Sequence, residues 1–316
     1  LTRASGLRIL AEIGGGWQLL GVPSLFEMGL SDCRWIYRLG SRTITVHGVA
    51  AGDAPAMQWR ISVAGEPCRF LVAGHLVLGE REFEQSGRVT MEADKNRIAF
   101  APGADWLWGR AYPEARMHLV TSTPQAVAAL GGDSLLYDDG ASHGAGVATL
   151  LSHPTTDLVV AVTGSMTGAA AAEKLADRYA AGIEQEALLE PARRFWSHAT
   201  RDLTLSGDHP DIAAANLLLP WLAHDAIVHL TVPHGLEQYT GAAWGTRDVC
   251  QGPVEFLLAM RHDTAVHRIL LALFAEQDRK TADWPQWFML PPYSSIRAGD
   301  AHGDVIIWPL KALCDY

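Results

Sequence analysis

The chain has 316 residues, of which 48% are hydrophobic and 19% charged, and its formal net charge at pH 7 is −10. This composition is that of a folded globular protein long enough for two domains, and it excludes an intrinsically disordered chain. The negative balance and the absence of a Lys/Arg cluster from the sequence argue against nucleic acid or an anionic membrane as a partner.

The cysteines and the apolar runs of the sequence indicate where in the cell the protein is expected to be. Four cysteines are scattered along the chain without a Cys-x-x-Cys pair: Cys33, Cys68, Cys250 and Cys314. We expect them to be buried, reduced thiols of a cytoplasmic protein. The longest apolar run, residues 217–230, is interrupted by Pro220 and Asp225 and falls short of the roughly 20 residues that a membrane-spanning helix needs.

Residues 1–163 are predicted to form a β-sandwich domain, because short β-branched or alternating runs recur between turns rich in Gly, Asp, Asn and Pro. The runs are Trp35–Leu39, Thr43–His47, Met57–Val63, Arg69–Val72, Arg88–Met91, Arg97–Phe100, Met117–Thr121, Val147–Leu151 and Leu158–Val162. Five tryptophans are expected in the core of this domain: Trp17, Trp35, Trp59, Trp106 and Trp108.

The pattern changes at about residue 164. Ala169–Ala181 is rich in Ala, Glu, Lys and Leu and is predicted to be a helix, with Ser165 or Thr167 as its N-cap. A second helix is expected over Ile183–Ser197. Residues 164–204 are therefore interpreted as a helical linker.

From residue 205 onward the chain alternates between helices and loops. The predicted helices are Asp211–His229, Gly252–Arg261, Asp263–Glu276 and the start of another in Gly303–Tyr316. Between the first two lies Pro233–Gln251, a polar and aromatic segment with the composition of a functional loop. Arg247 and Asp248 fall where the next helix should begin, and aromatic faces beside such groups suit a sugar. A capped helix start with two core aromatics, Tyr239 and Trp244, is the simpler alternative.

One stretch of this loop carries a family resemblance. Trp244-Gly245-Thr246-Arg247-Asp248-Val249-Cys250-Gln251 resembles the Gly-x-Arg-Asp-x-x-Gln segment of glycoside hydrolase family 94, whose members include inverting glycoside phosphorylases. The blocks Ala282–Phe288 and Asp300–Leu310 fit the same family. His234–Tyr239 is most similar to the members that act on 1,2-β-linked, sophorose-type oligoglucans. The resemblance covers about residues 205–316.

This resemblance implies a fold and a reaction. Residues 205–316 would be the N-terminal part of an (α/α)₆ barrel, which these few helices cannot close, so the chain is expected to be cut from a longer one. The expected fold class is thus an N-terminal β-sandwich, a helical linker and an incomplete barrel. In the implied reaction, inorganic phosphate attacks the anomeric carbon, an Asp protonates the glycosidic oxygen, and α-glucose 1-phosphate leaves.

The resemblance also implies which residues bind the substrate. Asp248 would accept sugar hydroxyls, Arg247 would orient Asp248 or bind sugar, and the Asp300–Asp304 block would lie across the same pocket. The full set of implied substrate-binding residues is Gln238, Tyr239, Trp244, Arg247, Asp248, Gln251, Asp300, His302 and Asp304. We expect the carboxylates of Asp248 and Asp304 to face a common cavity.

The general acid is expected beyond Tyr316. In the family it lies in a Gly-Asp-Trp-Asn/Asp-Asp motif downstream of the block that Trp308-Pro309-Leu310 resembles. Asp283 is not assigned to this role, because Pro285 follows Trp284 and the block comes too early. Ala242 stands where cellobiose-acting members carry an Arg, which argues against cellobiose as the substrate.

The expected partners are an oligosaccharide and phosphate as co-substrate, with no organic cofactor and no metal, and the resemblance allows a homodimer. His224 and His229 are five residues apart, which is not the spacing of a helical zinc site. Two other functions stay open: a non-catalytic carbohydrate-binding module, and an inverting hydrolase on the same barrel. An incomplete barrel is also expected to leave apolar helix faces exposed, namely at Leu217, Leu218, Leu219, Phe256, Leu257, Leu270, Leu271 and Phe274.

Overall fold

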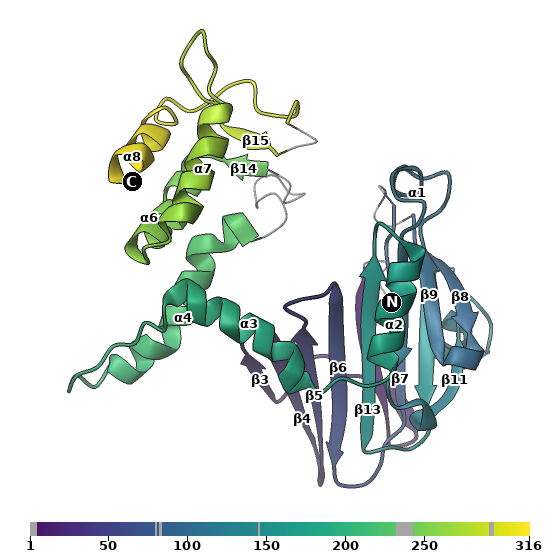
Figure 1. Cartoon of the computed structure of the whole chain (residues 1–316). Coiled ribbons are helices and arrows are strands. Elements are labelled where there is room, and N and C mark those ends of the chain that lie inside the picture. Colours follow the sequence, from purple (N-terminus) through teal and green to yellow (C-terminus); the bar gives the residue numbers. More distant parts are fainter. Residues whose placement is uncertain (1–4, 80, 82–83, 145, 232–242, 291–293) are drawn as a thin grey trace. The chain divides into compact units, whose positions relative to one another are not determined.

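The computed structural model describes residues 5–79, 81, 84–144, 146–231, 243–290 and 294–316 (Figure 1). The chain forms two compact units, Leu1–Arg193 and Arg194–Tyr316, and the division falls within helix α3 (Gln185–Thr200). The predicted boundaries after residues 163 and 204 stay predictions. None of the described helices is long and apolar enough to cross a membrane.

Two antiparallel sheets make up most of the first unit. The eight-stranded sheet has the order β3-β4-β5-β6-β13-β10-β9-β8, and the five-stranded sheet has the order β11-β12-β7-β1-β2. Their strands are β1 (Gly6–Ile13), β2 (Gly16–Leu19), β3 (Leu25–Met28), β4 (Asp32–Leu39), β5 (Arg42–Ala50), β6 (Ala56–Ala64), β7 (Phe70–His75), β8 (Arg88–Glu92), β9 (Arg97–Ala101), β10 (Arg116–Thr121), β11 (Val127–Gly131), β12 (Val147–Ser152) and β13 (Asp157–Ser165). Each of the nine predicted runs overlaps one of these strands. The prediction that the N-terminal part is rich in β-strands is therefore confirmed, and the strands form large antiparallel sheets.

The core of this unit lies between apolar strand faces. In β6 the buried face changes along the strand: Ala56 is buried toward α2, whereas Ile61 and Val63, on the opposite face, are buried in the core between the sheets. The central strand β7 is buried along its whole length. Fully buried side chains of the cluster include Ile44, Ile61, Phe70, Ile98, Phe100 and Leu158. Trp35 and Trp59 pack against it as expected, whereas Trp108 belongs to the short helix α1 (Leu107–Ala111) and is partly exposed.

Helix α2 (Ala169–Ala180) packs on the eight-stranded sheet (Figure 1). Its buried face is made of Ala172, Ala176 and Tyr179, and the small alanines let the helix approach Val120 and Ala161 of the sheet closely. The predicted N-cap is wrong: Gly168 caps α2 with extended backbone and no side-chain bond. Ser165 Oγ instead accepts the N–H of Thr167 at 3.3 Å within the turn, because the turn ends before the helix begins.

A buried arginine also joins α2 to the sheet. Arg97 of β9 is 1% exposed and donates to Glu92 and, on α2, to Glu173 and Asp177. His118 of β10 lies beside them, with Nε2 3.6 Å from Glu173 Oε1. Burial and the charge of Arg97 lower the pKa of His118. Burial acts to raise the pKa of Glu173, but the hydrogen bond and charge of Arg97 outweigh it and lower that pKa.

Helices dominate the second unit. Its elements are α4 (Ile212–Thr231), β14 (Ala243–Gly245), α5 (Thr246–Cys250), α6 (Gly252–Ala259), α7 (Asp263–Ala275), β15 (Trp287–Met289) and α8 (Ile307–Asp315). They pack around a cluster that includes Ile227, Val249, Val254, Val266, Leu273 and Phe288. The predicted helices are present within a few residues. Their closure into an (α/α)₆ barrel stays a prediction.

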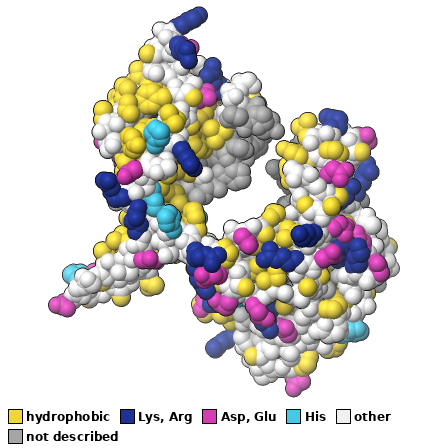
Figure 2. All heavy atoms as spheres, viewed as in Figure 1, with side chains coloured by type: hydrophobic (Ala, Val, Ile, Leu, Met, Phe, Trp, Pro, Cys, Tyr) yellow, Lys and Arg dark blue, Asp and Glu magenta, His cyan; other side chains and the backbone are white. Residues whose placement is uncertain are grey.

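The expected apolar exposure is correct for only some of the named residues. Leu217 is 76% exposed, Leu218 59% and Leu271 60%. Leu257 and Leu270 are buried, because α6 and α7 pack against each other and supply part of the core themselves. Figure 2 shows hydrophobic side chains gathered on the surface of this helical unit.

Candidate carbohydrate site in the helical unit

A two-stranded ribbon brings two of the predicted motif blocks together. β14 pairs with β15 in antiparallel register, with Trp244 opposite Phe288. Directly after β14, Thr246 donates its N–H to the carbonyl oxygen of Gln286 at 3.0 Å and its hydroxyl to that of Pro285 at 2.7 Å. Thr246 is fully buried, so these bonds fix the start of α5 against the second block.

The first turn of α5 presents Arg247 and Asp248. Both are partly exposed, with 34% of the Arg247 side chain and 25% of the Asp248 side chain accessible. Arg247 Nε lies 3.9 Å from Asp248 Oδ1, and Arg247 Nη1 lies 3.5 Å from Asp304 Oδ2. The guanidinium therefore lies near two carboxylates that come from distant parts of the chain. The cavity that Asp248 and Asp304 are expected to share stays a prediction.

Asp304 is further held by its own helix region. The indole Nε1–H of Trp308 donates to Asp304 Oδ2 at 3.3 Å. This hydrogen bond lowers the pKa of Asp304. Burial has a smaller, opposite effect, and the charge of Arg247 lowers the pKa further. Asp304 is thus a carboxylate at neutral pH, suited to accepting hydrogen bonds from hydroxyls and unsuited to giving a proton to a leaving group.

The rest of the Asp300–Asp304 block divides between two places. His302 donates its backbone N–H to Gln286 Oε1 at 3.0 Å, and its side chain is exposed. Asp300 lines a hollow of about 480 Å³ together with Asp283 and Arg297. Asp283 Oδ1 accepts the N–H of Trp284 at the edge of this hollow.

The remaining predicted residues have other surroundings. Trp244 is partly buried against the core of the unit, with its ring centroid 6.1 Å from that of Phe288. Gln251 is half-buried at the junction of α5 and α6. Gln238 and Tyr239 lie outside the described residues.

Sequence reasoning missed three residues that support this site: Thr246, Gln286 and Trp308. Gln286 joins the blocks twice, because its backbone carbonyl accepts from Thr246 and its side-chain oxygen accepts from His302. Of these three residues, only Trp308 could have been predicted from the sequence. It follows Asp304 by four residues, a spacing at which side chains on a helix contact each other.

The two carboxylates and the guanidinium together can recognise a polyol. Carboxylate oxygens accept hydroxyl hydrogens, and the planar guanidinium donates to hydroxyl oxygens or to an anion such as phosphate.

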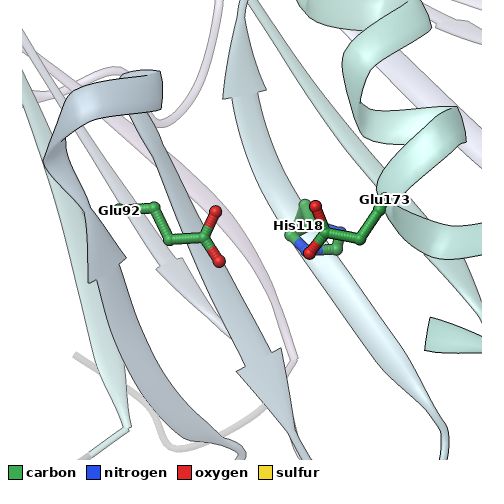
Figure 3. A group of neighbouring side chains, drawn as sticks. All are labelled: Glu92, His118 and Glu173. Carbon is green, nitrogen blue, oxygen red and sulfur yellow. The ribbon is translucent and has the colours of Figure 1, made fainter. Parts of the chain in front are cut away.

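Among the described residues, one group of side chains could hold a metal ion: Glu92, His118 and Glu173. This group belongs to the first unit and not to the candidate carbohydrate site (Figure 3).

Comparisons with known proteins define first the fold and then the family. A family GH92 inverting mannosidase of Bacteroides thetaiotaomicron is similar in fold, with a TM-score of 0.58 and 13% identity over 96% of this chain and 42% of that one. A bacterial glucoamylase complexed with acarbose is similar with a TM-score of 0.61 and 10% identity, over 91% of this chain and 47% of that one. At these identities the likeness shows the fold alone, an antiparallel β region combined with helices.

The family follows from the sequence comparisons. The glycoside phosphorylase supersandwich domain matches residues 1–164, which is more than half of the chain. The chain therefore belongs to this glycoside phosphorylase family, and the resemblance to such enzymes is confirmed. A 1,2-β-oligoglucan phosphorylase of Listeria innocua serovar 6a is 31% identical over 318 residues, which cover all of this chain and 28% of that protein.

Proposed function

We propose that this chain is part of an inverting phosphorylase of β-linked, 1,2-type glucan oligosaccharides. One observation in the structure supports the sugar site: Arg247 lies between the carboxylates of Asp248 and Asp304 and so joins both motif blocks at one place. The named relative acts, by its name, on 1,2-β-oligoglucans, and it supports the choice of substrate.

In this proposal each residue has a defined part. Asp248 and Asp304 accept hydroxyl hydrogens of the glucosyl unit at the cleaved bond, and Arg247 orients both carboxylates. Inorganic phosphate attacks the anomeric carbon from the face opposite the leaving oxygen. We place the general acid outside residues 1–316, in the part of the relative's length that this chain does not span. Without general acid catalysis, worth about 10²–10⁴-fold, residues 1–316 on their own should release no glucose 1-phosphate.

The subsites in this proposal extend to the other predicted residues. Gln238, Tyr239, Trp244 and Gln251 would line the sugar next to Asp248, and Asp300 and His302 would contact a neighbouring sugar unit. The four cysteines are all free, which supports a reducing, cytoplasmic location. Only Cys68 and Cys250 are buried, so the expected burial is wrong for Cys314, which is exposed, and for Cys33, which is partly buried.

The test uses a longer form of the protein that contains this chain, with sophorose-type oligosaccharides and phosphate. Asp248→Asn removes the charge from hydrogen bonds worth about 1.5–3 kcal/mol each, so kcat/KM should fall at least about tenfold. The matched control is Asp263→Asn, because Asp263 also begins a helix of this unit and pairs with an arginine, Arg261, at 3.3 Å. It should leave the kinetics unchanged.

Product analysis separates the alternatives. Release of α-glucose 1-phosphate that depends on phosphate supports the proposal. Glucose released without phosphate would make the protein a hydrolase, and oligosaccharide binding without any product would make it a binding module. If Asp248→Asn folds normally and keeps full activity, Asp248 serves only to begin α5 and the site is wrongly placed.

A further inference from the structure

Three side chains of the first unit converge on a small region between α2 and the eight-stranded sheet (Figure 3). Glu92 comes from the end of β8, His118 from the middle of β10, and Glu173 from α2. Each offers one ligand atom, and these atoms all lie within 4.8 Å of one another. We propose that Glu92, His118 and Glu173 bind a divalent first-row transition-metal ion, for which Zn²⁺ is the representative probe.

The distances suit such an ion. Zn–N and Zn–O bonds of about 2.0–2.2 Å at tetrahedral angles place neighbouring ligand atoms roughly 3.3–3.6 Å apart. His118 Nε2 and Glu173 Oε1 are 3.6 Å apart, so these two ligands already have the required spacing. The ligand atom of Glu92 lies within 4.8 Å of the other two, and its partly exposed side chain, at 23%, must bring it closer to complete the set. An imidazole with two carboxylates favours zinc, manganese or iron over calcium or magnesium, which prefer oxygen ligands alone.

Arg97 positions the two carboxylates without using all of their oxygens. Its Nε donates to Glu92 Oε2 and its Nη2 to Glu173 Oε2. Oε1 of Glu173, the oxygen nearer His118, stays available. Ligand carboxylates that are fixed by hydrogen bonds from outside the metal site are the usual arrangement in metalloproteins.

The charges of the cluster leave room for a cation. Three carboxylates, from Glu92, Glu173 and Asp177, surround Arg97, whereas the positive side chains that contact them are Arg97 and Lys95. With a neutral His118 the cluster carries one surplus negative charge. A divalent ion on the oxygens that Arg97 does not engage neutralises this surplus and leaves the cluster with one net positive charge.

A second observation, independent of the acidic side chains, points to a bound ion. His118 is 1% exposed, and among the described residues its Nδ1 has no hydrogen-bond partner. The same is true of Oγ1 of Thr163, which is the residue directly opposite His118 across the β10–β13 pair. Metal-bound histidines almost always donate their other ring N–H to a nearby oxygen. Binding of an ion at Nε2 fixes the tautomer with Nδ1–H, and in this proposal the unpaired Oγ1 of Thr163, on the neighbouring strand, accepts it through one water.

The alternative occupant of this region is Arg97 itself, as the centre of an ion-pair network that needs no metal. The test distinguishes the two on the 316-residue chain, stripped with a chelator and then exposed to Zn²⁺ or Co²⁺. We expect one equivalent of metal to remain after desalting, a higher melting temperature of the first unit, and the visible absorption of Co²⁺ in a low-symmetry site.

Variants assign the ligands. His118→Gln and Glu173→Gln should each raise the dissociation constant for Zn²⁺ at least about tenfold. Thr163→Val should raise it about tenfold, because it removes the acceptor proposed for the Nδ1–H of His118. The control is His143→Gln, because His143 and Asp139 form an exposed His–carboxylate pair at 2.9 Å elsewhere in the same unit. It should bind metal as the original chain does.

Two results would overturn the proposal. One is a folded chain that retains no metal, which would leave the Arg97 ion-pair network only. The other is uptake that His118→Gln, Glu173→Gln and Glu92→Gln all leave unchanged, which would mean adventitious surface binding. Glu92→Gln keeps the test open if either of the other two variants fails to fold.

Discussion

Thr246 shows how much of the candidate site depends on a single buried hydroxyl. Thr246→Val keeps the shape but removes the hydroxyl that donates to the partly buried carbonyl of Pro285, and such a hydrogen bond contributes about 0.5–1.5 kcal/mol. We expect a loss of that size in the free energy of unfolding, measured with urea. Thr246→Ser keeps the hydroxyl and loses one methyl group, at about 0.8 kcal/mol. A valine variant as stable as the original chain would show that the bond contributes little.

At the scale of elements, the charged contacts between α2 and the sheet make the stability of the first unit depend on pH. His118 faces Arg97, Glu92, Glu173 and Asp177, and its folded pKa lies below its ordinary value. The unfolded chain therefore binds more protons there, and stability is lost as pH falls through about 6.5. Glu173 also has a lowered folded pKa, so its contribution is present above its unfolded pKa and is lost as pH falls further.

The melting temperature of the first unit, measured in a chelating buffer, should therefore fall steadily from pH 7 toward pH 4. His118→Gln should flatten the upper part of this profile, between about pH 7 and 5.5, and leave the lower part. His143→Gln is the control, because His143 lies outside the α2 contact and half of its side chain is exposed. A profile that His118→Gln does not change would contradict this assignment.

At the scale of the whole molecule, the helical unit exposes apolar stripes. Leu218 and Leu222 of α4 are 59% and 61% exposed, and on α8 Ile307, Leu310 and Leu313 are exposed at intervals of three residues. We expect the isolated chain to bind a hydrophobic dye and to associate as its concentration rises, because exposed apolar patches favour both.

Replacing Leu217, Leu218 and Leu222 together with Gln should lower dye binding and association, measured by fluorescence and light scattering. The control is Val22→Gln, because Val22 is 95% exposed but belongs to the first unit. If the triple variant behaves like the control, the stripe on α4 is not the surface responsible.

Local sequence patterns determined most of the elements. The helix predicted at Asp263–Glu276 is observed at Asp263–Ala275, because a 3.6-residue apolar period and an acidic first turn are local properties. Strands β1, β2, β3 and β11 were not predicted. The sequence of β3, Leu-Phe-Glu-Met, is too short to show the alternation of apolar and polar residues that identifies a strand. The motif around Arg247 also pointed to the family, although the family model matches the β-rich residues 1–164, where no local motif was recognised.

Only the tertiary structure decided which charged residues meet. In the sequence, Arg97 looks like an ordinary strand residue, yet its side chain is buried. One of its carboxylate partners is Asp177 on α2, 80 residues further along the chain, so no local pattern could predict this ion pair. The contact between Arg247 and Asp304 and the double role of Gln286 arise in the same way. Periodicity and capping depend on neighbours in the sequence, whereas ion pairs and buried hydrogen bonds depend on how strands and helices pack, and a single sequence does not encode that packing in any local pattern.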